Sequence, residues 1–258
     1  MVKLAFVTGA SSGIGQALAA RFYEAGYCLA LVARRADEMS AWAKAKGWQP
    51  DRYRVYVADV AVVDSIIAAA QACMAAQGVP DVVIASAGIS VGIDTACRED
   101  LDVMARVFAI NNVGMAASFH PFLDGMLRRG SGTLVGIASV NGIRGFPGHG
   151  AYCASKAGVI GYCESLRGEM RGTGVRVVTI SPGYIRTPLT QGNRYSMPFL
   201  MRASDFAQRA FIAIESGVSY RVIPWQMAVV ARILRILPNR VFDRIFAGRT
   251  RKRRTSET

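Results

Sequence analysis

Short apolar runs that alternate with helical segments are the feature that most restricts the fold of this chain. Six runs have the length of strands and are stopped by polar or glycine-rich residues, at 3–8, 28–33, 53–58, 82–85, 132–138 and 175–180. Helical patterns separate several of them, such as the alanine-rich stretch 63–77. This alternation predicts a parallel sheet covered by helices on both faces. A further run, 220–224, resembles a last strand.

The size and composition of the chain agree with one large α/β domain or two small ones. It has 258 residues, of which 52% are hydrophobic, enough for a buried core, and 19% are charged, which argues against disorder. No internal repeat or linker interrupts the alternation. We therefore predict a single domain over residues 1–224, followed by a helical and basic extension over 225–258.

Cysteine and histidine usage bears on metal binding and on the cellular compartment. The five cysteines form no C-x-x-C pair, and only His120 and His149 accompany them. This argues against a zinc site, so we expect no metal. Scattered cysteines in apolar stretches indicate reduced thiols in a cytoplasmic protein. No signal peptide is visible, because strand-like sequence begins at residue 3.

A glycine-rich turn follows the first predicted strand. Residues 9–15 read G-A-S-S-G-I-G, and apolar residues at helical spacing follow until Gly26, which suits a helix end. Glycines let the backbone approach a pyrophosphate closely, and a helix N-terminus offers free N–H groups and positive potential. The pattern G-x-x-x-G-x-G therefore predicts a phosphate-binding loop, and a mere tight turn between strand and helix is the alternative.

Polar or glycine residues stand at the ends of successive predicted strands. They are Gly9, Arg34, Asp59, Gly88, Ser139 and Gly183. Ligands of open parallel sheets bind beyond the carboxyl ends of the strands, so we expect these residues to meet at one edge.

Two arginines end the second predicted strand and bear on the choice of cofactor. Dinucleotide sites often carry an acid here for the ribose 2′-hydroxyl, whereas an arginine suits a 2′-phosphate. In this chain Ala33 is followed by Arg34 and Arg35, and the first acid is Asp37. The pattern favours NADP(H) over NAD(H), and two solvated arginines at a strand end are the alternative.

Tyr152 and Lys156 lie four residues apart in a segment that reads as a helix running to about Gly172. At this spacing two side chains share a helix face, one turn apart. A free phenol has a pKa near 10, and a neighbouring ammonium favours the phenolate, so we expect Lys156 to lower the pKa of Tyr152. Such a tyrosine can give a proton to a carbonyl and take one from an alcohol. The alternative is an ordinary amphipathic helix start with an exposed lysine.

Asn111 falls inside a long predicted helix, residues 100–120, together with Asn112 and Gly114. Polar residues and glycine are unfavourable within helices. Asn111 is therefore either a surface residue or the mark of a helix distortion at a functional site.

In their order and spacing, these motifs resemble the short-chain dehydrogenase/reductase family over about residues 3–190. The resemblance rests on Thr8-Gly-Ala-Ser-Ser-Gly-Ile-Gly15, Asp59-Val60, Ser86-Ala-Gly88, Asn111, Ser139, Tyr152-Cys-Ala-Ser-Lys156 and Pro182-Gly183 with Thr187. One departure is Ala85-Ser86-Ala87-Gly88, where the family usually has Asn-Asn-Ala-Gly. Ser86 can still form hydrogen bonds, so we expect a local adjustment without loss of activity.

The resemblance implies an α/β fold of the Rossmann type, a doubly wound parallel sheet with helices on both faces. It also implies catalytic roles. Tyr152 would exchange the proton, Ser139 would hold the substrate oxygen and Lys156 would hold the nicotinamide ribose. Asn111 would anchor a water that relays protons to Lys156. The implied cofactor contacts are Gly9, Ser11, Ser12, Gly13, Ile14, Gly15, Arg34, Arg35, Asp59, Val60, Ala87, Gly88, Tyr152, Lys156, Pro182, Gly183, Ile185 and Thr187.

The segment after Thr187 is rich in apolar residues, and in this family the corresponding region closes over the substrate. Residues 188–203 therefore predict a lid and an apolar or bulky substrate. Simple packing of these side chains is the alternative.

The extension after residue 224 combines apolar and basic residues. The formal net charge of the chain is +13, and residues 221–258 hold ten Lys or Arg against two acids. The apolar run 225–237 carries charge and is short for a membrane span. Three interpretations stay open: a helix packed on the substrate mouth or a dimer partner, an interfacial helix on an anionic membrane, or a solvated basic end. The run 249–254 adds attraction to anionic lipid and can bind nucleic acid nonspecifically, but no motif indicates a specific nucleic-acid role.

Together these features predict an oxidoreductase that transfers a hydride between NADP(H) and a carbonyl or secondary alcohol, with an apolar or lipid-like substrate. The alternatives are a dinucleotide-binding sensor or scaffold without turnover and a peripheral membrane protein. The intact set of Ser139, Tyr152 and Lys156 argues against the sensor. The family resemblance also implies a homo-oligomer, and we expect a cytoplasmic protein with membrane contact through the extension as an option.

Overall fold

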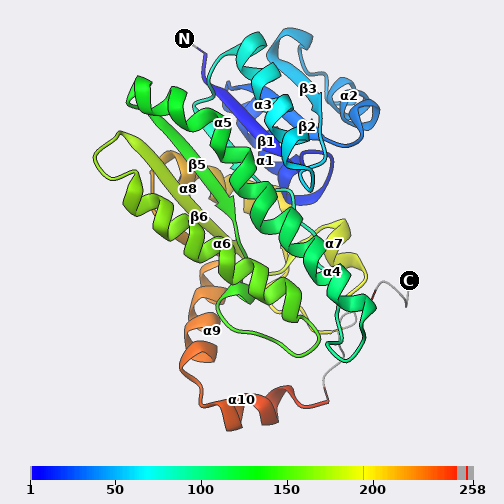
Figure 1. Cartoon of the computed structure of the whole chain (residues 1–258). Helices are drawn as coiled ribbons and strands as arrows, with labels where there is room; N and C mark the ends of the chain where they lie inside the picture. Colours follow the sequence, from blue (N-terminus) through cyan, green and yellow to red (C-terminus); the bar gives the residue numbers. More distant parts are fainter. Residues whose placement is uncertain (1, 194, 249–253, 255–258) are drawn as a thin grey trace.

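The computed structural model describes residues 2–193, 195–248 and 254 (Figure 1). At its centre lies a seven-stranded parallel sheet in the order β3-β2-β1-β4-β5-β6-β9. The strands are β1 (Leu4–Thr8), β2 (Cys28–Ala33), β3 (Tyr53–Val57), β4 (Val82–Ala85), β5 (Gly132–Ile137), β6 (Val175–Pro182) and β9 (Tyr220–Ile223). The predicted parallel sheet, including its last strand, is confirmed.

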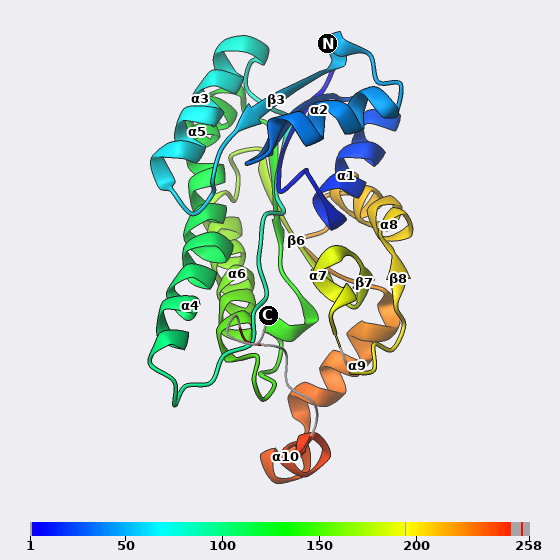
Figure 2. The same ribbon diagram turned by 90° about the vertical axis from the view of Figure 1, so that its right-hand side faces the viewer.

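Helices cover both faces of the sheet, as the doubly wound fold requires (Figure 2). One face carries α1 (Gly13–Glu24), α2 (Ala36–Ala45) and α8 (Ala203–Glu215), and the other carries α3 (Val63–Gln77), α5 (Gly114–Arg129) and α6 (Gly150–Glu169). Adjacent residues of one strand enter opposite cores: Val7 packs in the core that contains Phe206, and Phe6 packs in the core that contains Ile66. Burial on both faces explains why the strands read as continuous apolar runs.

Strands β1 and β4 mark the point where the chain reverses the direction in which it adds strands. From β1 the chain moves outward to β2 and β3, and it then returns to β4 on the other side of β1. Thr8 is in register with Val32 of β2 and with Ala85 of β4, so the three strands end at one level. The loops that follow them diverge here and open a crevice at the carboxyl edge.

Two of the longer helices, α2 and α8, have no counterpart among the sequence patterns above. Helix α2 buries only Met39 and Ala43, so its apolar stripe is too thin to stand out. Helix α8 has a regular buried stripe that runs from Phe206 to Ile214, but three of its five members are alanines. Both helices pack their buried residues on the same face of the sheet as α1.

The predicted helix over 100–120 is longer than expected and is interrupted. It consists of α4 (Glu99–Phe108), a π-helical segment (Ala109–Val113) and α5, which continues to Arg129. Asn111 lies in the π-helical segment and is buried. Of the two interpretations of Asn111, the structure selects the helix distortion.

The chain after β6 forms smaller elements at the carboxyl edge. Strands β7 (Ile185–Arg186) and β8 (Met201–Arg202) pair in parallel, and α7 (Pro188–Gln191) lies between them in sequence. Helices α9 (Trp225–Ile236) and α10 (Asn239–Phe246) then form the predicted helical extension. Within the residues that the structure describes, no helix is long and apolar enough to cross a membrane.

Candidate active site

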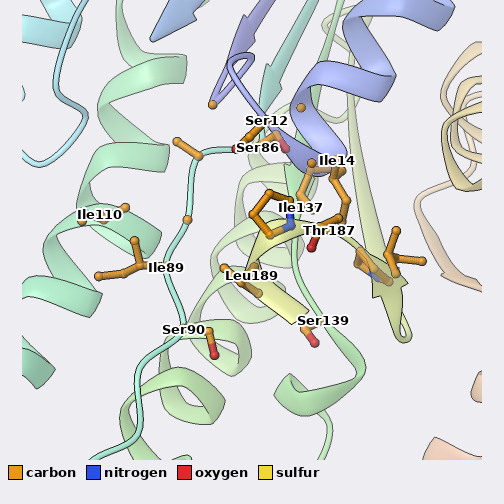
Figure 3. Close-up of a pocket in the computed structure, with 18 of the residues that line it drawn as sticks. Ser12, Ile14, Ser86, Ile89, Ser90, Ile110, Ile137, Ser139, Thr187 and Leu189 are labelled. Carbon is orange, nitrogen blue, oxygen red and sulfur yellow. The ribbon is translucent and has the colours of Figure 1, made fainter. Parts of the chain in front are cut away.

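A cavity of about 310 Å³ opens at the carboxyl edge of the sheet. Figure 3 shows Ile14, Thr187 and Ser139 on one side of it and Ile89 and Ser90 on the other. Apart from Asn111, every site residue predicted from the sequence lines this cavity. The structure therefore brings together the glycine-rich turn, the arginines after β2, and Ser139, Tyr152 and Lys156.

The backbone of the glycine-rich turn requires glycine at two positions, one for its φ angle and one for a close contact. Gly13 has a φ of +56°, which L side chains rarely adopt. A Cβ on Gly15 would lie 2.3 Å from the carbonyl oxygen of Gly9, so α1 starts directly against the end of β1. The side chain of Ser12 makes no capping hydrogen bond to α1. The first N–H groups of the helix are therefore available to an anionic ligand.

The ends of β1 and β4 are joined beside the cavity. Thr8 Oγ1 accepts hydrogen bonds from the backbone N–H groups of Ser86 and Ala87, each at 3.2 Å. Ser86 stands where the family usually has an asparagine. Its Oγ is buried, and no described residue provides a hydrogen-bond partner for it. Because Ser86 lines the cavity, a ligand is a suitable partner for this hydroxyl.

The two arginines after β2 differ in their surroundings. Both are exposed and both line the cavity. Arg35 forms an ion pair with Glu38, with 3.1 Å between Nη1 and Oε1. Among the residues that the structure describes, no carboxylate pairs with Arg34. Arg34 is therefore the arginine whose charge is available to a ligand phosphate.

The end of β5 positions both Ser139 and Lys156. Ser139 follows β5 directly, and its Oγ accepts a hydrogen bond from the backbone N–H of Asn141 at 3.2 Å. Lys156 comes from α6, and its Nζ donates to the carbonyl oxygen of Ile137 at 2.8 Å. Tyr152 lies one turn before Lys156 on the same helix, with its ring centroid 5.8 Å from the lysine Nζ. The three side chains thus share one wall of the cavity.

The pKa of Tyr152, beside Lys156, differs from what the sequence predicts. Burial raises the pKa of Tyr152 to about 12, and a hydrogen bond with Ser139 offsets this only in part. Burial lowers the pKa of Lys156 to about 8. The expectation that Lys156 lowers the pKa of Tyr152 is therefore wrong for this structure. Loss of hydration dominates both groups, and the lysine Nζ is engaged by the carbonyl of Ile137. Tyr152 consequently holds its proton at neutral pH.

Asn111 lies behind the cavity and supports its wall. Its Oδ1 accepts from the backbone N–H of Ile89 at 2.9 Å, and its Nδ2 donates to the Ile89 carbonyl at 3.0 Å and to Ser155 Oγ at 2.9 Å. Ile89 lines the cavity, and Ser155 precedes Lys156. The π-helical segment turns Asn111 inward, so one amide connects the loop after β4 to α6.

Further side chains line the cavity that are not among the site residues predicted from the sequence. Tyr184 and Tyr195 line the cavity, and their ring centroids are 6.3 Å apart. Tyr195 also lies edge-on to His149, with 5.6 Å between centroids. Burial raises the pKa of Tyr195, and the proximity of Tyr184 and Tyr152 adds to the shift. Arg106 of α4 also lines the cavity. Tyr195 falls within the segment 188–203 that the sequence predicts as a lid, and Tyr184 follows Pro182-Gly183, whereas no motif marks Arg106.

The basic run 249–254 lies outside the described residues except for Arg254. The Nε of Arg254 is 2.6 Å from Oδ2 of Asp100, which is buried at the start of α4. Asp100 Oδ2 also accepts from the backbone N–H of Asp94. This residue of the tail therefore contacts the loop that follows β4.

The residues of the cavity fit a dinucleotide cofactor. The start of α1 and the glycine-rich turn suit a pyrophosphate, because no side chain caps the first N–H groups of the helix and both elements line the cavity. The buried hydroxyl of Ser86 requires a partner that the described residues do not supply. Among those residues, no three His, Cys, Asp or Glu side chains come together as a metal site.

Comparison with known proteins agrees with this architecture. The chain matches the family model described as short chain dehydrogenase over residues 3–197. An uncharacterized oxidoreductase of Myxococcus xanthus (strain DK1622) is 37% identical over 244 residues, which cover 93% of this chain and 95% of the relative. An acetoacetyl-CoA reductase of Acinetobacter sp. (strain RA3849) is 33% identical, with 85% of this chain and 90% of the relative covered. The chain belongs to the short-chain dehydrogenase family of NAD(P)(H)-binding oxidoreductases.

Solved structures share the fold. A short-chain dehydrogenase/reductase from Burkholderia phymatum in complex with NAD has a TM-score of 0.80 and 24% identity, and the match covers 90% of this chain and 92% of that one. ElxO with NADP bound has a TM-score of 0.78 and 21% identity, and covers 86% and 97%. One neighbour binds NAD and the other NADP, so the fold accommodates both dinucleotides.

Proposed function

We propose that this protein is an NADP(H)-dependent oxidoreductase that reduces a ketone or aldehyde, or oxidises the matching alcohol, on an apolar substrate. One observation carries the proposal. A single cavity is lined by the glycine-rich turn, by Arg34, and by Ser139, Tyr152 and Lys156. Phosphate binding and proton transfer to a carbonyl are thereby provided in one place.

The proton chemistry belongs to the side chains on the wall formed by β5 and α6. When bound, the nicotinamide supplies or accepts the hydride. Tyr152 donates its proton to the carbonyl oxygen of the substrate, and Ser139 donates a hydrogen bond to the same oxygen as negative charge develops on it. With a raised pKa the phenol of Tyr152 carries its proton at neutral pH, so a proton is available for the carbonyl oxygen. Lys156 holds its position through Ile137 and offers its remaining N–H groups to the cavity.

The substrate end of the cavity supports an apolar substrate. Tyr184, Tyr195, Ile89 and Leu189 line it near the catalytic side chains. Tyr195 and Leu189 belong to the segment 188–203, which we propose as a lid over the substrate. Aromatic and aliphatic walls favour a substrate with an apolar body next to its carbonyl group.

The preference for NADP(H) rests on Arg34. It is exposed at the end of β2, lines the cavity, and has no carboxylate partner among the described residues. A guanidinium there can form charge-assisted hydrogen bonds to a 2′-phosphate. The 2′-hydroxyl of NAD(H) would find no acid at the end of this strand, because Ala33 precedes the arginines.

Oligomerisation and location complete the proposal. We propose a homo-oligomer, since members of the family commonly oligomerise, and light scattering after size-exclusion chromatography would measure it. The five cysteines are free thiols, three of them buried, which fits a reducing compartment such as the cytoplasm.

Replacing the proposed proton donor tests whether the protein turns over substrate. The experiment follows NADPH absorbance with a panel of ketones and aldehydes of increasing apolar size. In Tyr152→Phe we expect kcat to fall at least about a hundredfold, because the phenol proton is lost. The affinity for NADPH should stay within about threefold, since Phe keeps the ring. Full turnover in Tyr152→Phe would contradict the assigned role. NADPH binding without turnover of any carbonyl would favour the sensor.

A second experiment tests the cofactor preference by calorimetry. In Arg34→Ala we expect at least about a tenfold loss of NADPH affinity, because one charge-assisted contact to the 2′-phosphate is removed. NADH affinity should not change. Arg35→Ala is the matched control, and its effect should be smaller because Glu38 already pairs with Arg35. Equal loss for both dinucleotides, or no loss for NADPH, would remove Arg34 from the 2′-phosphate site.

A further inference from the structure

Helices α9 and α10 expose apolar side chains in a regular pattern. The C-terminal apolar surface, as we term it, consists of Trp225, Val229, Ile233, Ile236, Val241 and Ile245. The first three recur every four residues along α9, so they lie on one helix face. Trp225 is 66% exposed and Ile236 is 81% exposed. Six large exposed apolar side chains on two consecutive helices indicate an interaction surface.

Packing holds the two helices with this surface outward. Met227 of α9 lies so close to Gly183 that a Cβ on the glycine would be 2.7 Å from Met227 Cγ. Phe242 and Phe246 of α10 face inward, with ring centroids 5.8 and 5.2 Å from that of Phe146. The apolar residues of α10 therefore divide into an inward pair and an outward pair.

Arg144, from the loop after β5, joins the two helices. Its guanidinium donates to the carbonyl oxygens of Leu234 at 2.7 Å and Leu237 at 2.8 Å, at the end of α9. It also donates to Oδ1 of Asn239 at 2.9 Å, at the start of α10, and it lies 4.2 Å from the ring centroid of Phe242. The outward surface is thus anchored to the sheet domain.

Four arginines lie on the two helices that carry the C-terminal apolar surface. Arg232 and Arg235 lie on α9, and Arg240 and Arg244 lie on α10; all four are exposed. From β9 to the end of α10, the only acid in the sequence is Asp243. Of the carboxylates in the described part of the chain, none pairs with Arg232, Arg240 or Arg244. Helices α9 and α10 therefore combine exposed apolar side chains with positive charge.

We infer that the C-terminal apolar surface docks into the headgroup region of an anionic lipid bilayer. Apolar side chains on one helix face beside arginines are the pattern of helices that lie in a membrane interface. A second copy of the chain is a poorer occupant, because a two-fold interface would bring the same four arginines of each copy together with only Asp243 from each to offset them. Nucleic acid would match the arginines and leave the apolar side chains exposed to water.

The C-terminal apolar surface lies close to the cavity, so docking would bring the cavity near the lipid. Both views show α9 and α10 at the end of the molecule opposite the N-terminus (Figures 1 and 2). Gly183, which α9 touches, lines the cavity, and Val140 packs with Met227 and also lines it. Docking would hold one wall of the cavity next to the lipid, from which an apolar compound can enter. The inference itself does not depend on the proposed reaction.

The experiment measures sedimentation of the full-length protein with vesicles, without cofactor or substrate. The vesicles are phosphatidylcholine alone or phosphatidylcholine mixed with phosphatidylglycerol. Two double variants test the apolar and the charged residues separately. Trp225→Ser with Ile236→Ser removes apolar side chains, and Arg240→Ser with Arg244→Ser removes positive charge. Val57→Ser with Ile212→Ser is the matched control, because these residues are 63% and 56% exposed elsewhere on the molecule. Thermal unfolding confirms that each variant is folded.

We expect the wild type to bind the mixed vesicles, more weakly as salt rises, and to bind phosphatidylcholine at least about tenfold more weakly. Each surface variant should lose at least about tenfold in binding, and the control should match the wild type. Absence of binding to the mixed vesicles would overturn the inference. Equal binding of all proteins would also overturn it, and would move the contact to the basic tail, which every variant keeps. Loss of self-association in Trp225→Ser with Ile236→Ser, without vesicle binding by the wild type, would identify a second copy as the occupant.

Discussion

Lys156 is a buried cation whose Nζ has the carbonyl oxygen of Ile137 as its hydrogen-bond partner, at 2.8 Å. The pKa of Tyr152, one helical turn away, is also shifted mainly by loss of hydration. Burial favours the neutral form of each group, so the lysine pKa is lowered and the tyrosine pKa is raised. The two residues to which we assign the proton chemistry are thus held at a cost in stability, as is common for functional sites.

The cost of burying Lys156 can be measured as a dependence of stability on pH. Its pKa is about 8 in the folded protein and 10.5 when unfolded. The unfolded chain therefore binds more protons between these values, and the contribution of Lys156 to stability rises with pH across this window. Below pH 8 the penalty is complete, roughly 3 kcal/mol at most. We expect Lys156→Met to be about 2 kcal/mol more stable than wild type at pH 7, because the lost hydrogen bond offsets part of the gain.

Thermal unfolding of both proteins from pH 7 to pH 10 checks this expectation. The advantage of Lys156→Met should shrink as the pH rises from 8 towards 10.5. Other groups also make stability depend on pH in this range. Burial raises the pKa of Cys73 from 9.0 to about 12, for example, but such groups are present in both proteins. A stability difference that does not vary with pH would show that Lys156 is not desolvated in the folded state.

At the scale of elements, the start of α1 and the middle of α6 use glycine in different ways. A Cβ on Gly15 would lie 2.3 Å from the carbonyl oxygen of Gly9, which is backbone and cannot move aside cheaply. Gly161 lies inside α6, and a Cβ there would meet nothing within 4 Å. One glycine is required by the packing of helix on strand, and the other only weakens its helix.

Two alanine substitutions test this contrast between the elements. We expect Gly15→Ala to lower the free energy of unfolding by about 2 kcal/mol or more and to weaken binding of dinucleotides, because the turn must open. Gly161→Ala should raise it by about 0.5–1 kcal/mol, because alanine is the better helix former at an exposed site. Chemical denaturation and calorimetry measure the two effects. Tolerance of Gly15→Ala with unchanged NADPH binding would contradict the close approach of α1 to β1.

The interruption between α4 and α5 shows how one element serves the site. Residues 109–113 widen into a π-helical turn, and this turn directs Asn111 inward to Ile89 and Ser155. A regular α-helix has narrower turns than a π-helix, so we expect that the amide of Asn111 would not reach as far inward in one. The distortion therefore connects the loop after β4 to the helix that carries Tyr152.

At the scale of the whole molecule, the sheet and the C-terminal extension meet at the cavity. The sheet brings strand ends that are far apart in sequence to one edge, and α9 packs against Gly183 at that edge. Arg144 then fixes the end of α9 and the start of α10 to the loop after β5. The cavity wall that carries Ser139, Tyr152 and Lys156 is thus packed together with the helices that carry the C-terminal apolar surface.

Much of the fold and of the site composition could be predicted from local sequence. Strands buried on both faces must be apolar along their whole length, so their positions were visible, as for β2 and β4. The glycine-rich turn was visible because a tight turn between strand and helix needs glycine at fixed places. Helices α2 and α8 escaped prediction because their buried stripes are thin or rich in alanine.

The sequence by itself determined the parallel sheet and the set of side chains that gather at its carboxyl edge, because strand length, apolar pattern and turn chemistry are local properties. Only the tertiary structure decided the proton affinities of Tyr152 and Lys156, the inward turn of Asn111 and the outward face of α9. Each of these depends on burial. Burial is set by residues distant in the chain, such as Ile137 beside Lys156, Ile89 beside Asn111 and Gly183 beneath Met227.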